Sequence, residues 1–598
     1  MKKALDKERI KKFFKIFPFI LSFISAIGIY GLLAISEFES LSCNSFVYII
    51  IFGMYLIIYF TIKKPKLNDG IFLTVFSVFL SVILIIGSQL EFYSDIIWSS
   101  STLIKIIALS IALFPINYFL LKFIKKFMCL ENANIDYKKL FVKTFIIIFF
   151  FDFLVFLALY PGVYGYDSGY QIMQILESDV QITSHFSLLF SFLLAKIVNL
   201  GKILFNNYQI GFGMYCFLQM TFLSFVATKI TIFCAKRIQN RFLYFINILF
   251  FSFFPLYTIM CISSVQDSVF AGIFCLVVLY TIELVENDNY CNSKFNIFKL
   301  SILILLLCLI RNNGFYAVLF VIPFIFLCCK KRMLVVLLIF IAPLIAYKFY
   351  SDIILNYLGV IKVDTYREML SVPSQQFARV YNYNISAYTE NEIGKLQKFY
   401  PGIADFKYYI YRQSIADPTK AVIDNDYVKD NFKEYIDLWF HIGIKDSKNY
   451  IEAFLLNSLG FWYPNKSYKD ERIFHPYIEI EMLDVQKWNP KYLNIKRESK
   501  LPIYEKVLNK IVGDNAWKEI PIFSTVFTAG TYFIIFLYLL SLTILRKNFK
   551  YLLPISIIAG LYVTLLLSPV ALFRYCFPIV MVSPLMLNLI LYQKGKNS

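Results

Sequence analysis

The sequence predicts an all-α polytopic membrane protein with about 14 transmembrane helices and an extracytoplasmic domain that is mixed or mostly helical. Hydrophobic residues make up 59% of the 598-residue chain and charged residues 17%, whereas soluble proteins carry about 25% charged residues. The mean hydropathy is +0.63. Apolar runs of about 20 residues, long enough to cross a bilayer, recur from Phe13 to Tyr592. Each run is expected to be helical, because a backbone inside a bilayer must satisfy its own hydrogen bonds.

The formal net charge of +19 is explained by the loops between these runs, and no nucleic-acid partner is expected. Lys and Arg gather in short loops such as KKPK and RKNFK, which is typical of cytoplasmic loops. The basic start MKKALDKERIKKFFK places the N-terminus inside, and the alternation of sides then predicts that both termini are cytoplasmic. A composition rich in Ile, Phe, Asn, Lys and Tyr indicates a multi-pass protein of a bacterial cell membrane.

The expected spans lie at about 13–35, 46–62, 71–87, 102–123, 140–160, 210–233, 242–261, 268–286, 297–310, 314–329, 333–350, 522–545, 551–568 and 572–592. The apolar run at 186–204 is different. If it crossed the bilayer, the basic stretch 235–241 would lie outside. We therefore interpret it as a re-entrant or interfacial helix, with a true span as the alternative.

This assignment of spans and sides divides the chain into three predicted parts. Residues 1–350 form a transmembrane region with a catalytic external loop at 160–185, residues 351–520 form the extracytoplasmic domain, and residues 521–598 form the C-terminal transmembrane helices. The Trp and Tyr residues of the middle part fit either stacking on sugars or a belt at the membrane interface.

Two external turns each carry an aspartate where a helix is expected to begin. Asp167 lies in YPGVYGYDSGYQ and Asp267 in SSVQDS. Helix capping explains a single such residue. Two of them on one side of the membrane also fit a shared site, in which a carboxylate acts as a general base or holds a divalent cation. Ser168 and Gln171 follow Asp167, and a helix restarting at the aspartate places Asp167 and Gln171 on one face.

Arg311 and Arg574 directly follow apolar runs, in LLLCLIRNNG and SPVALFRYCFP. Charged residues at bilayer depth mark functional sites by default, although arginines at the interface also serve as simple anchors. A guanidinium matches the oxygens of a phosphate, so a phosphate clamp is the functional interpretation. Asn312 suits a tight turn that faces a polar ligand. His185 begins the run at 186–204, where an interfacial histidine is the alternative to a binding role.

These motifs, with VPSQQFARV and GFWYP, resemble in order and sidedness the GT-C superfamily of polytopic glycosyltransferases over residues 150–580. The resemblance implies transfer of a sugar from a polyprenyl-phosphate donor, by an inverting reaction, to a cell-envelope glycan, lipid or protein acceptor on the outer face. It implies that Asp167 activates the acceptor, that Asp267 supports it, and that Arg311, Arg574 and the adjacent Tyr575 bind substrate. The chain departs from the family pattern where Ser168 follows Asp167 and where His185 precedes Phe186 and Ser187 instead of two prolines.

Two other functions fit the same features. One is a flippase or transporter of lipid-linked glycans, and the other is a surface-polysaccharide polymerase. A transporter would show internal repeats and polar residues at the bilayer midplane, and the sequence shows neither clearly. A divalent cation on Asp167 and Asp267 is the one cofactor that the pattern accommodates.

Overall fold

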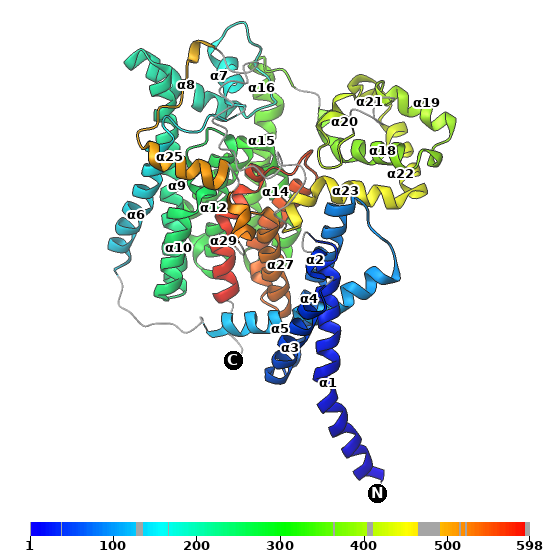
Figure 1. Cartoon of the computed structure of the whole chain (residues 1–598). Helices are drawn as coiled ribbons and strands as arrows, with labels where there is room; N and C mark the ends of the chain where they lie inside the picture. The colour runs from blue at the N-terminus through cyan, green and yellow to red at the C-terminus, as the bar shows by residue number, and fades with distance from the viewer. Residues whose placement is uncertain are drawn as a thin grey trace.

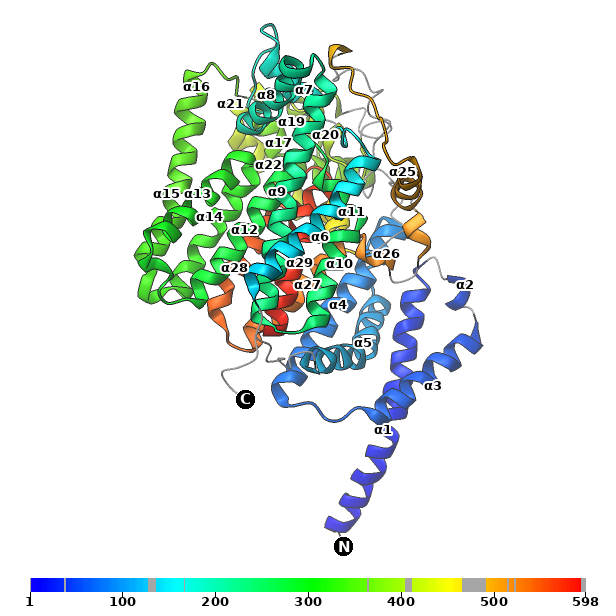
Figure 2. The same cartoon turned by 90° about the vertical axis from the view of Figure 1, so that its left-hand side faces the viewer.

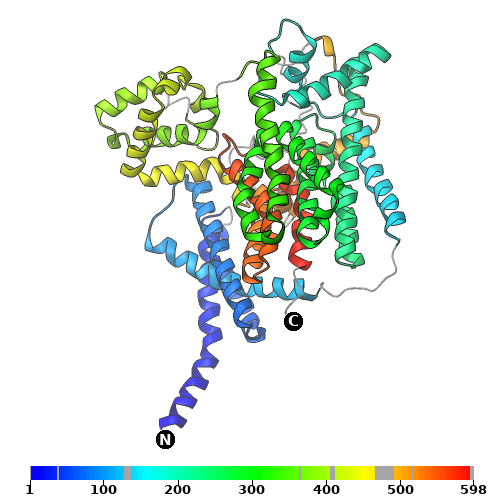
Figure 3. The ribbon, with the colours of Figure 1, turned by 180° about the vertical axis from the view of Figure 1, so that it is seen from behind.

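The computed structural model describes residues 2–36, 39–42, 44–126, 136–165, 167–362, 365–403, 411–464, 491–513, 516–520 and 523–592. Within them the chain forms a bundle of long helices, with a smaller helical unit beside one end (Figures 1 and 3). We call that end, uppermost in Figure 1, the upper end, and the opposite one the lower end. Both the start of α1 and the end of α29 lie at the lower end.

The helices of the bundle are α1 (Lys2–Leu33), α3 (Ser45–Thr61), α4 (Leu67–Tyr93), α5 (Ser100–Lys126), α6 (Tyr137–Ala158), α8 (Leu188–Phe205), α9 (Tyr208–Arg237), α10 (Arg241–Phe253), α11 (Pro255–Cys261), α12 (Gln266–Glu286), α13 (Lys294–Ile310), α14 (Asn312–Cys328), α15 (Met333–Phe349), α27 (Ala529–Leu545), α28 (Leu552–Leu566) and α29 (Phe573–Tyr592). The central helices α12 and α29 pack against each other and are buried along most of their length. Both are apolar on every side, which is the composition expected of helices inside a larger bundle.

Ten of the described helices are long and apolar enough to cross a membrane, or 11 if the bent pair α10 and α11, which meet at 56°, is one span. The chain is therefore an all-α protein with many membrane-spanning helices. A helix occupies every predicted span, but α3, α13, α14 and α27 have only 17 residues each. The count of 14 stays a prediction.

Helix α8 meets the length and hydropathy criteria for a span, yet both of its ends lie at the upper end (Figures 1 and 2). Ser187, at its start, donates its hydroxyl to the carbonyl oxygen of Leu309 at 2.7 Å, near the upper end of α13. From there α8 packs antiparallel to α9, with Gly201 against Gly211. The close approach needs glycine, because a Cβ on Gly201 would lie 2.2 Å from the backbone of Gly211. The interpretation of residues 186–204 as a re-entrant or interfacial helix stays a prediction.

The smaller unit has a hydrophobic core of its own, which runs from Leu370 to Tyr450. Its helices are α17 (Thr365–Met369), α18 (Ser371–Tyr383), α19 (Glu390–Phe399), α20 (Asp417–Ala421), α21 (Asn425–Asp430), α22 (Phe432–Lys445) and the start of α23 (Ser447–Trp462). Many apolar side chains between Leu455 and Trp517, including those of Leu456, Trp462 and Leu508, belong instead to the core of the bundle. The separate core is thus narrower than the domain predicted at 351–520. We call residues 365–450 the upper unit.

Residues of two motifs singled out in the sequence make internal contacts, one within the upper unit and the other on the bundle. Gln376 binds the carbonyl oxygen of Tyr450 and accepts from the indole N–H of Trp439. Tyr463 of GFWYP hydrogen bonds to Ser88 on α4 at 2.8 Å, and Trp462 is buried. The Trp462 ring is therefore not a surface on which a sugar could stack.

Candidate functional site

Two loops at the upper end are joined by backbone hydrogen bonds. One follows α6 and leads into α7 (Ser168–Leu176), and the other connects α11 to α12. The N–H of Val163 donates to the carbonyl oxygen of Ile262 at 2.9 Å, and the N–H of Ser264 donates to that of Val163 at 3.0 Å. This short parallel pairing fixes the starts of α7 and α12 side by side, and each start carries one of the two aspartates.

Buried side chains reinforce the pairing. The Ser168 hydroxyl lies 2.7 Å from both the carbonyl and the hydroxyl oxygen of Ser264. From α9, the amide of Gln219 donates to the carbonyl oxygens of Cys261 and Ser263 at 2.9 and 2.8 Å. The Ser168 hydroxyl thus holds the two loops together, and its predicted contact with substrate stays a prediction. Gln219 was not singled out in the sequence, although a glutamine within an apolar run is the kind of signal that marks a site.

The first charged pair of the site joins the beginnings of α7 and α29. The guanidinium of Arg574 donates to the Asp167 carboxylate at 3.0 Å. Asp167 occupies the N-cap position of α7, but within the described residues its carboxylate makes no capping hydrogen bond. The Asp167 side chain thus forms an ion pair with Arg574 and does not cap its own helix.

The second charged pair joins Asp267, in the first turn of α12, to Arg311, between α13 and α14. The Arg311 guanidinium also lies over the ring of Tyr575, 4.5 Å from the ring centroid. Arg311 interacts electrostatically with both Asp167 and Arg574, so the two pairs are neighbours. Four charged residues predicted to share one side of the membrane therefore form one cluster. We call Asp167, Arg574, Asp267, Arg311 and Tyr575 the upper cluster.

The two pairs differ in exposure. The Asp267 side chain is 4% exposed, whereas that of Asp167 is 24% exposed. A ligand from the upper side therefore reaches Asp167 and its partner Arg574 more readily. The Asp267–Arg311 pair lies next to them and is more deeply buried at its carboxylate.

The segment before Arg574 is held by the upper unit. The N–H of Ala416 donates to the carbonyl oxygen of Pro569 at 2.7 Å, and Ile415 pairs with Val570. From α23, the Asn457 amide donates to the carbonyl oxygen of Ser568 at 2.8 Å. The position of Arg574 therefore depends on contacts made by segments more than 100 residues away in the chain.

The remaining predicted site residues take different positions. Gln171 lies one turn after Asp167, and its buried side-chain oxygen has no hydrogen-bond partner among the described residues. Asn312 accepts a hydrogen bond from the Tyr347 hydroxyl at 2.6 Å and so is engaged with α15. His185 is exposed, and its recorded ring contact is with the adjacent Phe186. Gln171 thus adds a free polar atom near Asp167, whereas Asn312 and His185 are not seen to join the cluster.

The predicted cation site does not match the cluster well. Among the described residues, no three His, Cys, Asp or Glu side chains gather as metal ligands. Each of the two aspartates is instead neutralised by a guanidinium. A divalent cation would have to displace both guanidinium groups from the aspartates, so the charge pattern does not favour a cation here.

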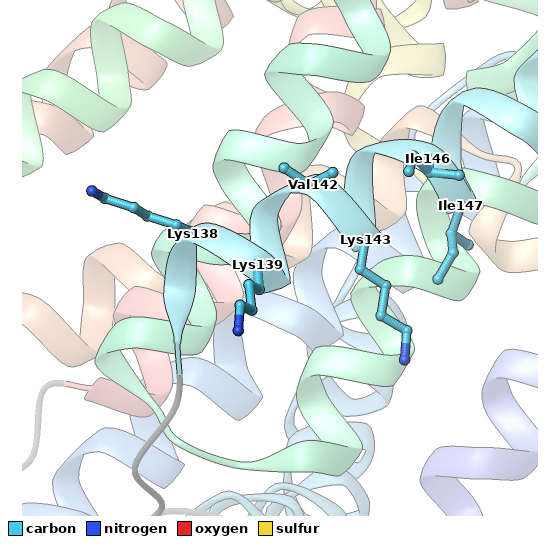
Figure 4. A pocket seen from close by; sticks show the side chains of 6 residues that line it. All are labelled: Lys138, Lys139, Val142, Lys143, Ile146 and Ile147. Carbon is cyan, nitrogen blue, oxygen red and sulfur yellow. The ribbon is translucent and has the colours of Figure 1, made fainter.

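A recess of about 560 Å³ lies at the other end of the molecule, on α6, and is lined by Lys138, Lys139, Val142, Lys143, Ile146 and Ile147 (Figure 4). Lys139 and Lys143 extend to the same side of the helix, whereas Lys138 points away (Figure 4). Lysines beside apolar residues at a helix end are typical of a membrane interface. The recess is far from the upper cluster and is not part of it.

The loop that precedes Asp167 has no room for a side chain at Gly162. This glycine has φ of +127°, and a Cβ there would lie 2.3 Å from the sulfur of Cys216. We expect Gly162→Ala to lower the melting temperature, because strain of this kind costs about 1–3 kcal/mol. Gly53→Ala in α3 is the control, since a Cβ there meets nothing within 4 Å. Equal melting temperatures for the two variants in detergent would show that the loop is not constrained as described.

The sequence of residues 175–598 matches a family described as a family of unknown function, DUF6020. The matched region contains Asp267, Arg311, Arg574 and Tyr575, whereas Asp167 lies just before it. Comparison with curated proteins and with solved structures gives no match. Because the matched region covers more than half of the 598 residues, the chain belongs to the DUF6020 family.

Proposed function

We propose that this protein is a membrane glycosyltransferase that transfers a sugar from a polyprenyl-phosphate donor to a cell-envelope glycan, lipid or protein. The observation that carries the proposal is the Asp167–Arg574 pair, which lies partly exposed where helices of the bundle end. A lipid-linked phosphate sugar has its tail in the bilayer and its reacting bond at the interface. A carboxylate and a guanidinium at that depth are the two groups that its transfer requires.

Binding of the donor phosphate to Arg574 would break the Asp167–Arg574 ion pair and free the Asp167 carboxylate. A phosphate offers the guanidinium more oxygens and more negative charge than a carboxylate does. Donor binding would therefore draw Arg574 toward the phosphate and release Asp167. The freed carboxylate is then a base that is available only when the donor is in place.

The transfer itself is a single displacement. Asp167 accepts the proton of the acceptor hydroxyl while that oxygen attacks the anomeric carbon, and the bond between this carbon and the phosphate oxygen breaks. The polyprenyl phosphate leaves with the bonding electron pair, and Arg574 stabilises its charge. The configuration at the anomeric carbon is inverted. The proton on Asp167 is then lost to solvent.

Asp267, Arg311 and Tyr575 are assigned a supporting role. The ion pair with the buried Asp267 holds the Arg311 guanidinium in place. The ring of Tyr575, the residue after Arg574, packs against this guanidinium. Arg311 adds positive charge next to the proposed phosphate position. No metal is included in this proposal, because two arginines already neutralise the charges involved.

The proposed orientation places the upper end outside the cell. The lower end carries basic loops, including the turn of Lys330, Lys331 and Arg332 between α14 and α15. Lys and Arg are enriched in cytoplasmic loops. Both termini are then cytoplasmic, the protein lies in a bacterial cell membrane, and the upper unit faces the acceptor.

The test is the lipid content of a strain that lacks the gene. We expect its extracts to accumulate a polyprenyl-phosphate sugar, and the intact gene to reverse the accumulation. Extracts that match those of the parent strain, in lipid type and amount, would remove the basis of the proposal. Accumulation of a complete lipid-linked oligosaccharide would favour the flippase or the polymerase instead.

Arg574→Ala should reduce use of the donor by about 10- to 100-fold, since hydrogen bonds to charged groups contribute about 1.5–3 kcal/mol. The measurement is donor-dependent transfer in membranes, with protein amounts matched. Arg332→Ala is the control, because Arg332 pairs with the exposed Asp288 at the lower end. Unchanged donor dependence in Arg574→Ala would contradict the role of Arg574 as a phosphate ligand.

A further inference from the structure

Residues 495–500 form a strap along the end of α6 that leads into the Asp167 loop. The strap is part of the orange trace that runs down from the upper end in Figures 1 and 2. The N–H of Lys500 donates to the carbonyl oxygen of Leu157 at 2.8 Å. In a continuing helix this carbonyl would accept from the residue four places on, but that residue is Pro161 and has no N–H. The strap therefore supplies a hydrogen bond that the end of α6 cannot make by itself.

Arg497 occupies the middle of the strap. Its guanidinium donates to the carbonyl oxygen of Leu159, which directly follows α6, and the N–H of Glu498 donates to that of Tyr160 at 2.9 Å. Burial lowers the pKa of Arg497 to about 10, against the charge of Glu505, which raises it. Its Nε is buried without a hydrogen-bond partner among the described residues. What the cation gains is the carbonyl end of α6, the negative end of the helix dipole, so Arg497 is tied to the end of this helix.

The carbonyl group that Arg497 holds begins the loop that leads to Asp167. The oxygen of Leu159 also accepts from the N–H of Gly162 at 2.8 Å, so the two bonds together set the direction in which the loop leaves α6. Arg497 acts electrostatically on Cys216 of α9, whose sulfur leaves no room for a Cβ on Gly162. The guanidinium thus lies beside the first turn of the loop. The later residues of the loop are fixed by their pairing with the loop between α11 and α12.

We propose that Arg497 is a positioning residue for the transfer reaction, because it fixes the start of the loop that holds Asp167 beside Arg574. This inference rests on the proposed function. Arg497 is assigned no contact with donor or acceptor, so it acts through the position of the Asp167 carboxylate. A displacement of about 1 Å at a reacting group can cost about 100-fold in rate. Loss of Arg497 should therefore lower kcat, while the KM for the donor, which depends on Arg574, stays the same.

Arg497→Met tests the proposal in the full-length protein, with the polyprenyl-phosphate sugar that the deletion strain accumulates as donor. The change keeps the apolar stem of the side chain and removes the hydrogen bond to Leu159. We expect kcat to fall about 10- to 100-fold at an unchanged KM for the donor, and hydrogen exchange to become faster in peptides that cover residues 160–176. Arg497→Lys, which can still donate to Leu159, should recover most of both. Lys496→Met is the control, because it removes the same charge one residue earlier from an exposed side chain.

Hydrogen exchange needs no substrate, so it separates this proposal from the proposed function. If the unmodified protein transfers no sugar, the proposed function fails, and the positioning role falls with it even where Arg497→Met loosens the loop. If transfer occurs but Arg497→Met changes neither loop exchange nor kcat, Arg497 does not position Asp167.

Two further outcomes contradict the proposal in favour of a different role. A higher KM for the donor at constant kcat would make Arg497 a donor ligand. A lower melting temperature with faster exchange in all helices would make it a general stabilising contact. If Arg497→Met does not fold, Arg497→Gln replaces it as a neutral donor to Leu159, and a fall in kcat without faster loop exchange in that variant would overturn the positioning role.

Discussion

Asp167→Asn should leave the protein folded and present in membranes while it lowers sugar transfer by about 10²–10⁴-fold, the contribution typical of a positioned general base. Asparagine has the shape of aspartate and can still accept a hydrogen bond from Arg574, but it cannot take the proton of the acceptor hydroxyl. The measurement is transfer from a polyprenyl-phosphate sugar in isolated membranes, together with reversal of lipid accumulation in the deletion strain.

Asp179→Asn is the matched control for this variant. Asp179 lies 12 residues further along the chain, in the loop after α7, and is exposed. The two variants make the same change of charge, so a loss confined to Asp167→Asn would belong to the site. Full transfer by Asp167→Asn would remove Asp167 from the catalytic role and leave its pair with Arg574 as a structural contact.

Arg379→Met is expected to give the largest loss of stability. Arg379 and Glu452 form an ion pair whose side chains are 2% and 0% exposed, and Arg379 also donates to the carbonyl oxygen of Ser94 at 2.8 Å. Removing one partner of a buried pair costs about 3–5 kcal/mol, because the other charge stays buried without compensation. The loss should appear as a lower melting temperature in detergent and as earlier proteolytic release of the upper unit.

Lys395→Met provides the comparison within the same unit. Lys395 pairs with Glu434 at 3.1 Å, but the two side chains are 40% and 37% exposed. Exposed pairs contribute about 0–1 kcal/mol, so this variant should unfold nearly as the unmodified protein does. The double variant R379M/E452L should recover much of the lost stability, since it leaves no buried charge. Similar melting temperatures for Arg379→Met and Lys395→Met would show that the buried pair does not anchor the unit.

The sequence predicted the bundle well because its helices are set by the solvent around them. An apolar run in a bilayer has to form a helix whatever its neighbours are. The span expected at 140–160 is α6 (Tyr137–Ala158), and the one expected at 268–286 is α12 (Gln266–Glu286). The same reasoning placed four charged residues at one end, since each lies where an apolar run begins or ends.

The sequence was less informative about roles within the site. Ser168 was expected to contact substrate because it follows Asp167, yet its hydroxyl faces Ser264, 96 residues away. Trp462 fitted sugar stacking by residue type, yet it packs inside the bundle. A residue type indicates what a side chain can do, whereas its neighbours decide which of those possibilities remains open.

The sequence by itself therefore determined the class of the protein, the ends of most helices and the gathering of Asp167, Asp267, Arg311 and Arg574 at one end of the bundle. Only the tertiary structure decided the partners: Arg574 lies beside Asp167 across 407 residues of chain, and Arg311 lies beside Asp267. The physical reason is that helix formation depends on local composition and solvent, whereas pairing depends on which helices pack together. The same packing leaves the Asp167–Arg574 pair partly exposed and buries Asp267. The proposed catalytic role of the first pair and supporting role of the second depend on this difference.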